Sequence, residues 1–140
     1  MKNARLFFAA FLLSFCLLFS RCTPDTTGLV SSTEEVLIKN VWSIDYYFNN
    51  QDMTNNFGGS RLLFSSTGSV GYQKNGETIS GTWSKITDAS NNEFITLHLN
   101  TKDADATRLN ESWMLTSRSA SSIQFEETSG TGILFRIKAQ

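Results

Sequence analysis

The chain contains very little of the chemistry on which most metal sites and nucleophilic active sites depend. Its 140 residues include two cysteines, one histidine and one proline. Two cysteines are too few for a Cys₄ zinc site, and one histidine cannot build a histidine-rich one. That histidine, His98, alternates with apolar neighbours and is therefore expected on the outer face of a strand. We predict no catalytic residue, no metal ion and no cofactor, and we do not expect an enzyme.

Basic clusters are also missing. The chain has 12 Lys and Arg residues against 13 Asp and Glu residues, and no stretch interleaves basic side chains with aromatic ones. Proteins that hold a nucleic-acid backbone need such clusters to neutralise its phosphates. The composition therefore excludes nucleic-acid binding from the expected functions.

The N-terminal residues have the pattern of an export signal. Lys2 and Arg5 precede an apolar run over residues 6–19 that is interrupted by Ser14 alone. The run is shorter than the ~20 apolar residues of a membrane-spanning helix, and a basic segment before a short apolar one is typical of a secretory signal peptide. We predict a signal peptide over residues 1–21. Its removal, which includes Arg21, would leave nine basic residues against 13 acidic ones and a net charge near −4.

Cys22 directly follows the predicted signal peptide, and this arrangement resembles the lipobox of bacterial lipoproteins. The resemblance implies that Cys22 is lipidated and anchors the protein to the cell envelope. Thr23 follows it, where some bacteria place an aspartate for inner-membrane retention, so we expect the outer membrane. Two alternatives stay open: acylation at Cys16, or an ordinary signal peptide with Cys22 as an incidental residue. If Cys16 leaves with the signal peptide, the mature chain can form no intramolecular disulfide.

Residues 22–32 are predicted to be a flexible tether. The segment is polar, contains the only proline and shows no hydrophobic period. A flexible chain of this length has an r.m.s. reach of ~17 Å. The tether would therefore keep the domain that follows close to the membrane surface.

Residues 33–140 have the pattern of one small all-β domain. Ser32 and Glu35 have the spacing of a capping box, which predicts a short helix before the first strand. Beyond it, apolar and polar residues alternate in about eight short segments, and Asn75-Gly76 is the strongest hairpin signal between them. Because the connections are short, we expect an eight-stranded antiparallel up-and-down meander closed into a barrel. A two-sheet β-sandwich is the alternative.

The alternation also predicts which side chains face the barrel interior. In the first strand, Trp42, Ile44, Tyr46 and Phe48 share one face, which we predict to be the core face. The later strands add further rings to it: Phe64, Tyr72, Trp83, Trp113, Phe125 and Phe135.

The first and last strands resemble those of the lipocalin family. A short helix followed by Asn40-Val41-Trp42 is similar to the Gly-x-Trp entrance of the lipocalin barrel. Asn40 stands at the glycine position, and asparagine can adopt the left-handed conformation. Gly81-Thr82-Trp83 repeats the motif, as in small lipocalin-like lipoproteins of Gram-negative bacteria. The resemblance implies that Arg136, near the chain end, stacks on Trp42 and that the barrel binds a small hydrophobic molecule.

Two functions remain open at this point. In the first, interior rings line an apolar pocket for a small hydrophobic ligand. The candidate ligand-binding residues are Trp42, Tyr46, Phe64, Tyr72, Trp83 and Trp113. In the second, the same rings fill the narrow eight-stranded barrel. The protein is then a ligand-free structural or protein-interaction subunit of the cell envelope, and interior volume discriminates between the two.

Two polar loops are further candidates for recognition. Residues 49–56 join the first two strands, where lipocalins carry a lid, and their amides suit a sugar, a peptide or a partner protein as well as plain solvation. Residues 100–108 contain Asp103 and Asp105. Their spacing lacks the glycine and distal glutamate of a calcium-binding EF-hand loop, so no metal site is predicted there.

Overall fold

The computed structural model describes residues 31–140. The predicted signal peptide, Cys22 and the tether as far as residue 30 lie outside the described residues. None of the helices in the described part of the chain has the length and apolar character needed to cross a membrane.

Helix α2 (Thr33–Lys39) leads into the first strand and begins at the predicted capping box. The Ser32 hydroxyl accepts a hydrogen bond from the Glu35 amide at 3.1 Å, and the Glu35 carboxylate accepts one from the Ser32 amide at 2.9 Å. These reciprocal bonds satisfy amides that the first helical turn leaves unpaired. The helix buries Val36 and Leu37 in the core of the domain.

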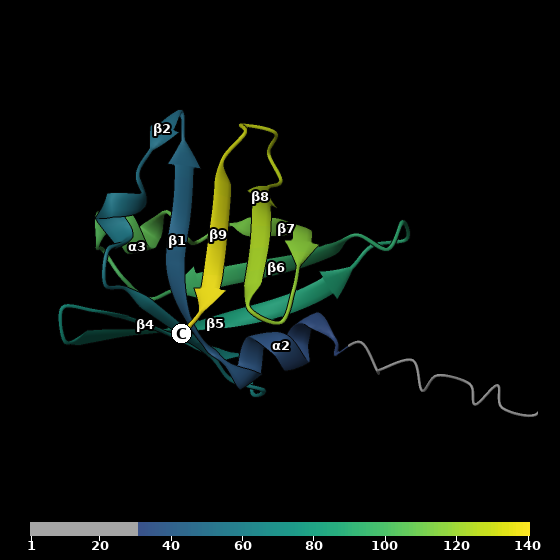
Figure 1. Ribbon diagram of the computed structural model, residues 1–140, viewed down its shortest axis with the longest axis horizontal. Helices are drawn as coiled ribbons and strands as arrows, with labels where there is room; N and C mark the ends of the chain where they lie inside the picture. The colour runs from purple at the N-terminus through teal and green to yellow at the C-terminus, as the bar shows by residue number, and fades with distance from the viewer. Residues whose placement is uncertain (1–30) are drawn as a thin grey trace, which may run out of the picture. The chain divides into compact units, whose positions relative to one another are not determined.

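Nine strands follow within the described residues, and eight of them close into an antiparallel barrel (Figure 1). Strand β1 pairs with β3, each strand from β3 to β9 pairs with the next, and β9 pairs with β1 to close the ring. The two-residue β2 flanks the end of β1. The strands are β1 (Val41–Asn49), β2 (Gln51–Asp52), β3 (Arg61–Phe64), β4 (Ser69–Lys74), β5 (Glu77–Thr87), β6 (Glu93–Leu99), β7 (Ser112–Arg118), β8 (Ser122–Glu127) and β9 (Leu134–Ala139). The predicted all-β meander barrel with a short helix before it is confirmed, and the chain does not form the β-sandwich alternative.

Two further short helices lie in the connections at the end of the barrel opposite α2. The 3₁₀ helix η1 (Thr54–Phe57) precedes β3, and α3 (Ala104–Thr107) lies between β6 and β7. We call this end the mouth, because β1 and β8 end there while α2 enters the fold at the opposite end (Figure 1).

A tight turn joins β4 to β5, as predicted. Asn75 and Gly76 have φ values of 52° and 83°, and the residues that flank them, Lys74 and Glu77, are register partners. Positive φ at both central residues is the requirement of a type I′ turn, whose twist matches that of the strands.

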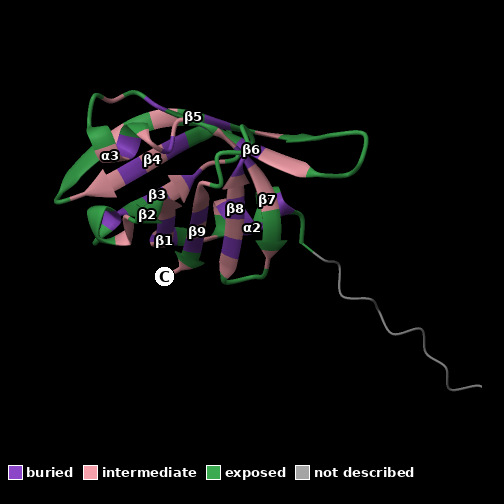
Figure 2. Ribbon diagram, turned by 90° about the horizontal axis from the view of Figure 1, so that it is seen from above, coloured by how far each residue is buried: buried purple, intermediate pink, exposed green. Residues whose placement is uncertain are grey.

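Alternation along the strands builds one apolar core inside the barrel. In β6, Ile95, Leu97 and Leu99 are buried while His98 is exposed, as predicted. Buried and less buried bands alternate along the strands in Figure 2. The largest side chains with less than 2% exposure are Trp42, Trp113, Tyr47, Tyr72, Phe57, Phe125, Phe135, Leu37, Leu62, Ile95, Leu99 and Leu109.

The predicted core face of β1 is wrong beyond Ile44. The pairing of β1 with β9 shifts register between Ile44 and Tyr46. A bulge of this kind adds one residue to a strand, and one added residue reverses which side chains face inward. Tyr47 is therefore the buried residue, at 1% exposure, while Tyr46 and Phe48 are half-buried on the outer side.

The expected stacking of Arg136 on Trp42 is not formed. Arg136 alternates with the buried Phe135 and Ile137, so its guanidinium lies on the outer face. There its Nε donates to Asp45 Oδ1 at 2.9 Å. Its Cζ lies 5.6 Å from the centroid of the Tyr46 ring, a cation–π distance.

Asn40 does not take the left-handed conformation expected at the glycine position. Its φ of −119° and ψ of 158° are extended. Its side chain acts instead, because Nδ2 donates to the Val36 carbonyl of α2 at 3.1 Å. The Asn40 side chain thus satisfies a backbone carbonyl at the end of α2, as a residue in the left-handed conformation does at the end of other helices.

Candidate functional site

The three tryptophans tie the barrel wall to the segments that cover its ends. Trp42 Nε1 donates to the carbonyl of Leu37 in α2 at 2.9 Å. Trp113 Nε1 donates to the carbonyl of Leu109, just after α3, at 3.0 Å. Trp83 Nε1 donates at 2.9 Å to a carbonyl in the turn between β3 and β4. Each indole N–H is therefore used within the fold rather than left for a ligand.

The interior rings pack directly on one another. The ring centroids of Trp113 and Phe135 lie 5.1 Å apart, and so do those of Phe125 and Phe135. Tyr47 and Phe57 are closer still, at 4.8 Å. These are contact distances for aromatic side chains, so the protein's own rings occupy this part of the interior.

Five of the six candidate ligand-binding residues lie in this packed core, each at most 7% exposed. The five are Trp42, Phe64, Tyr72, Trp83 and Trp113. Tyr46, the sixth, is the residue that the bulge in β1 turns outward. The structure thus brings the first five together as core residues and separates Tyr46 from them.

The mouth of the barrel is covered by η1 and α3. Phe57 of η1 is 1% exposed, and Ala106 of α3 and Leu109 after it are both 0% exposed. These apolar residues come from, or directly follow, the two polar loops that the sequence singled out. Each loop therefore places an apolar side chain over the mouth and its polar ones around it.

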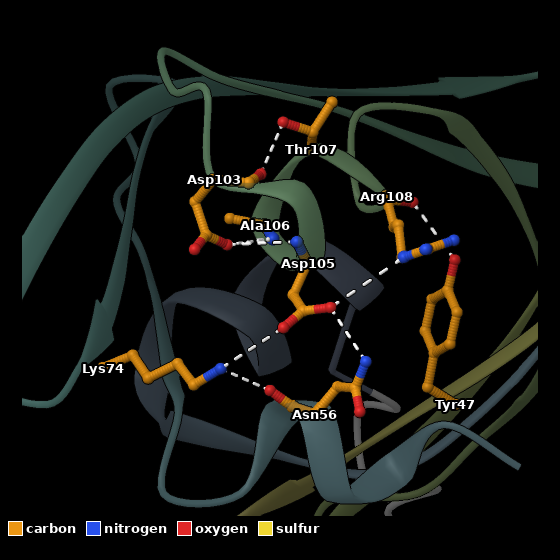
Figure 3. Close-up of polar contacts among 8 residues, drawn as sticks. All are labelled: Tyr47, Asn56, Lys74, Asp103, Asp105, Ala106, Thr107 and Arg108. Carbon is orange, nitrogen blue, oxygen red and sulfur yellow. Dashed lines mark hydrogen bonds and ion pairs between the residues drawn. The ribbon is translucent and has the colours of Figure 1, made fainter.

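Asp105 links three separate segments over the mouth (Figure 3). Its Oδ1 accepts a hydrogen bond from Asn56 Nδ2 of η1 at 3.0 Å, and its Oδ2 lies 3.6 Å from Lys74 Nζ of β4. Lys74 also donates to the Asn56 carbonyl. Arg108 Nε lies 3.9 Å from Asp105 Oδ1. The carboxylate of Asp105 therefore joins η1, β4 and α3.

Asp103 serves as the N-cap of α3. Its Oδ1 accepts hydrogen bonds from the amides of Asp105 at 3.1 Å and Ala106 at 2.8 Å. Within residues 31–140, no three or more His, Cys, Asp or Glu side chains are grouped in a way that could hold a metal ion. Of these two neighbouring aspartates, Asp103 thus caps α3 and Asp105 forms the ion pairs over the mouth.

Beside this cap, a groove of about 350 Å³ opens between the β4–β5 hairpin and the loop before α3. We call it the mouth groove; it is lined by Tyr72, Lys74, Asn75, Glu77, Ile79, Thr101 and Asp103. The sequence pattern did not predict Lys74 and Glu77 as members of a site. The available signal was the Asn75-Gly76 turn, which places those two residues opposite each other.

Tyr72 is the buried member of the mouth groove. It is 1% exposed, and its hydroxyl has no hydrogen-bond partner in the described structure. Burial raises the pKa of Tyr72, Ser60 lowers it, and the charges of Asp103 and Asp105 raise it further, with a net increase. The hydroxyls of Ser60 and Tyr72 do not meet in hydrogen-bond geometry, so both remain unpaired.

A different polar cluster lies at the α2 end. Lys85 Nζ and Glu93 Oε1 are 2.5 Å apart, and the hydroxyl of the buried Thr33 donates to the same carboxylate. Burial raises the pKa of Glu93, but the bonds from Lys85 and Thr33 outweigh that effect and hold it below its ordinary value. Arg118 donates to the Ser31 carbonyl and holds the chain where it enters α2.

Glu127 is a buried carboxylate whose partners are all local. It accepts hydrogen bonds from the Ser129 amide at 3.0 Å and the Thr131 hydroxyl at 2.7 Å, and the Ser129 hydroxyl also donates to it. Those bonds lower the pKa of Glu127. The residue therefore holds the turn between β8 and β9 and has the character of a structural group.

An apolar row lies on the outer wall across three strands. Ile86 pairs with Phe94, and Phe94 pairs with Met114, so the three side chains share one face. Because Ile95, next to Phe94, is buried, that face is the outer one. Ile86 is 59% exposed, and Phe94 and Met114 are half-buried. We call these three residues the outer row; Glu126, the partner of Met114 on β8, continues it.

Comparison with known proteins bears on the fold. No protein-family model matches the chain, and no curated protein sequence matches it. A crystal structure of a DUF4847 family protein from Bacteroides vulgatus ATCC 8482 is similar to it, with a TM-score of 0.59 at 12% sequence identity. The likeness covers 78% of this chain and 98% of that one. At this identity it shows the fold alone, and it fits a lipocalin-like barrel.

Proposed function

We propose that this chain is a lipoprotein of the cell envelope, anchored through acylated Cys22 in the outer membrane, and that its packed barrel is a protein-interaction subunit. The outer row carries the proposal. Three apolar side chains stand next to one another on the outer wall, and Ile86 among them is 59% exposed. Contiguous apolar surface on a small domain favours contact with another protein.

The packed interior supports this function over binding of a small hydrophobic molecule. A site for such a molecule typically has a volume of ~300 Å³ or more and an apolar lining. Here Trp113, Phe125 and Phe135 lie with ring centroids 5.1 Å apart in the interior. The groove of about 350 Å³ lies instead at the mouth and has a mostly polar lining.

The charge around the outer row favours a protein over a lipid surface. The row itself contains no Lys or Arg and continues into Glu126, whose register partners are Met114 and Leu134. Attachment to anionic lipid draws on basic side chains. A partner protein with an apolar strip and a basic side chain opposite Glu126 complements this surface.

The way the chain enters the fold supports a partner within the envelope. Arg118 holds Ser31 at the α2 end. Between Cys22 and Ser31, an extended chain spans at most ~30 Å. A lipid anchor at Cys22 would therefore keep the outer row near the membrane, within reach of other envelope proteins.

Photo-crosslinking in intact cells tests the proposal. A photoreactive amino acid replaces Ile86 in the full chain, and in a control it replaces Thr78, which is also exposed on β5 but close to the mouth. We expect an adduct with a second protein from position 86 and none from position 78. In the Glu126→Lys background the adduct should disappear, because the partner's basic side chain then meets a like charge.

Three results would contradict the proposal: an adduct of the chain with itself, an adduct with lipid, or a protein adduct that Glu126→Lys leaves unchanged. Native mass spectrometry of the purified full chain, exposed to a total bacterial lipid extract, addresses the competing function. We expect the barrel to take up no lipid. A discrete added mass that is lost in Trp113→Ala and kept in Cys22→Ala would favour the hydrophobic-ligand function instead.

A further inference from the structure

We propose that the mouth groove binds a small molecule that carries a primary ammonium group. The site is separate from the outer row and does not depend on it. Its volume of about 350 Å³ lies at the lower end of the range for small-molecule sites, which favours a ligand of a few heavy atoms over a polymer.

Two carboxylates at this groove have oxygen atoms that accept no hydrogen bond within the described residues. Asp103 uses Oδ1 to cap α3, and neither its Oδ2 nor the Glu77 carboxylate has a hydrogen bond or ion pair within residues 31–140. Both residues are exposed at the groove. An ammonium group donates three hydrogen bonds and carries the opposite charge, so it suits both acceptors.

Lys74 is the basic residue of the groove lining, and its charge is already engaged. Its Nζ donates to the Asn56 carbonyl and lies 3.6 Å from Asp105 Oδ2, so the ammonium group points toward the cap over the mouth (Figure 3). The remaining charge in the groove is that of Glu77 and Asp103. The groove therefore attracts cations and repels carboxylates and phosphates.

Tyr72 gives independent support for a ligand at the mouth groove. It lines the groove, is 1% exposed, and its hydroxyl has no partner. Buried polar groups in folded proteins are nearly always paired, and an unpaired one at a groove is explained by a partner that arrives with a ligand.

Calorimetric titration of the full chain in a non-ionic detergent tests the inference. Cadaverine is the probe, and glucose and acetate serve as hydroxyl-rich and anionic comparators. We expect cadaverine to bind, with an affinity that falls as salt is added, because the groove is partly exposed. Neither glucose nor acetate should bind. Binding of glucose or acetate as tight as that of cadaverine would overturn the assignment of ligand class.

Variants place the binding in the groove. Glu77→Gln and Asp103→Asn should each weaken cadaverine binding severalfold, and asparagine keeps the N-cap of α3. Glu111→Gln is the matched control, because Glu111 is an exposed carboxylate after α3 that does not line the groove. If Glu111→Gln weakens cadaverine binding by the same factor, the effect arises from net charge alone, and the proposed site is overturned.

Tyr72→Phe separates a ligand contact from a structural role. The substitution removes an unpaired buried hydroxyl, so the melting temperature of the free protein should stay the same or rise. Cadaverine binding should nevertheless weaken. A variant that keeps both its melting temperature and its affinity for cadaverine would remove Tyr72 from the site, and with it the observation on which the inference rests.

Discussion

At both ends of the barrel a fully buried tryptophan donates to a backbone carbonyl, and the two ends differ in the polar groups around that contact. At the α2 end, the fully buried Trp42 donates to Leu37, and Lys85 meets Glu93 at 2.5 Å against the buried Thr33. At the mouth, ion pairs of 3.6 and 3.9 Å join partly exposed side chains over the cap. The ion pairs at both ends are partly exposed and contribute ~0–1 kcal/mol each, whereas a buried tryptophan contributes several times more.

The polar groups at the α2 end serve the structure, whereas some of those at the mouth are free to bind a ligand. At the α2 end, the buried polar groups described above are paired within the fold. At the mouth, Tyr72 keeps an unpaired hydroxyl and lines a groove of about 350 Å³. A buried tryptophan therefore stabilises each end, and groups that remain free to bind a ligand are collected at the mouth.

Trp42→Ala should have the largest effect, because Trp42 is fully buried and its indole donates a hydrogen bond to α2. Deleting a fully buried tryptophan costs about 3–5 kcal/mol of unfolding free energy, and the Leu37 carbonyl would also lose its donor. Urea unfolding followed by circular dichroism measures the loss. Tyr46→Ala is the control on the same strand and should cost about 1 kcal/mol or less, since Tyr46 lies outside the core. Equal losses would contradict the bulge in β1.

Glu93→Gln should have an intermediate effect that depends on pH. The pKa of Glu93 is lowered below its ordinary 4.5, so its ion pair stabilises the fold above that value and the stabilisation is lost as the pH falls through the lowered pKa. At pH 7 the variant should be less stable by about 1 kcal/mol. The difference should shrink in acid.

Hydrogen exchange shows where in the fold Glu93→Gln lowers stability. Exchange in α2 should quicken in Glu93→Gln, because Thr33 loses a charged acceptor. Glu127→Gln removes another carboxylate of lowered pKa at the mouth end, and it should leave α2 protected. Stability curves of wild type and Glu93→Gln that stay parallel down to acid pH would contradict the ion pair at the α2 end.

Asp105→Asn should have the smallest effect on global stability, less than about 1 kcal/mol, because its ion pairs are partly exposed. Its local effect should be clear. Amides of η1 and α3 should exchange faster, since one carboxylate joins both to β4. Asp88→Asn, in the β5–β6 turn, is the control and should leave exchange at the mouth unchanged. Faster exchange that spreads to α2 would contradict the independence of the two ends.

Features set by neighbouring residues were predictable from the sequence. The sequence predicts the capping box of Ser32 and Glu35 and the Asn75-Gly76 turn, and both form in the structure. Each depends on contacts within four residues. The alternation of Ile95, Leu97 and Leu99 likewise follows from the two-residue period of a strand. Together these local signals were sufficient for the fold class.

Features set by register between distant strands were not predictable. The bulge that turns Tyr46 outward appears in the pairing of β1 with β9, about 90 residues apart. The contact of Arg136 with Asp45 depends on that same pairing. The outer row and the mouth groove are likewise products of register, since Ile86, Phe94 and Met114 belong to three strands.

By itself the sequence determined that residues 33–140 form a closed meander of short strands behind a capped helix, because alternation and turn chemistry act over a few residues. It also predicts an export signal and lipidation at Cys22. Only the tertiary structure decided that the aromatic side chains pack as a core and that Glu77 and Asp103 face one groove with Tyr72. Such placements depend on which strands pair and in which register, and no local pattern encodes that choice.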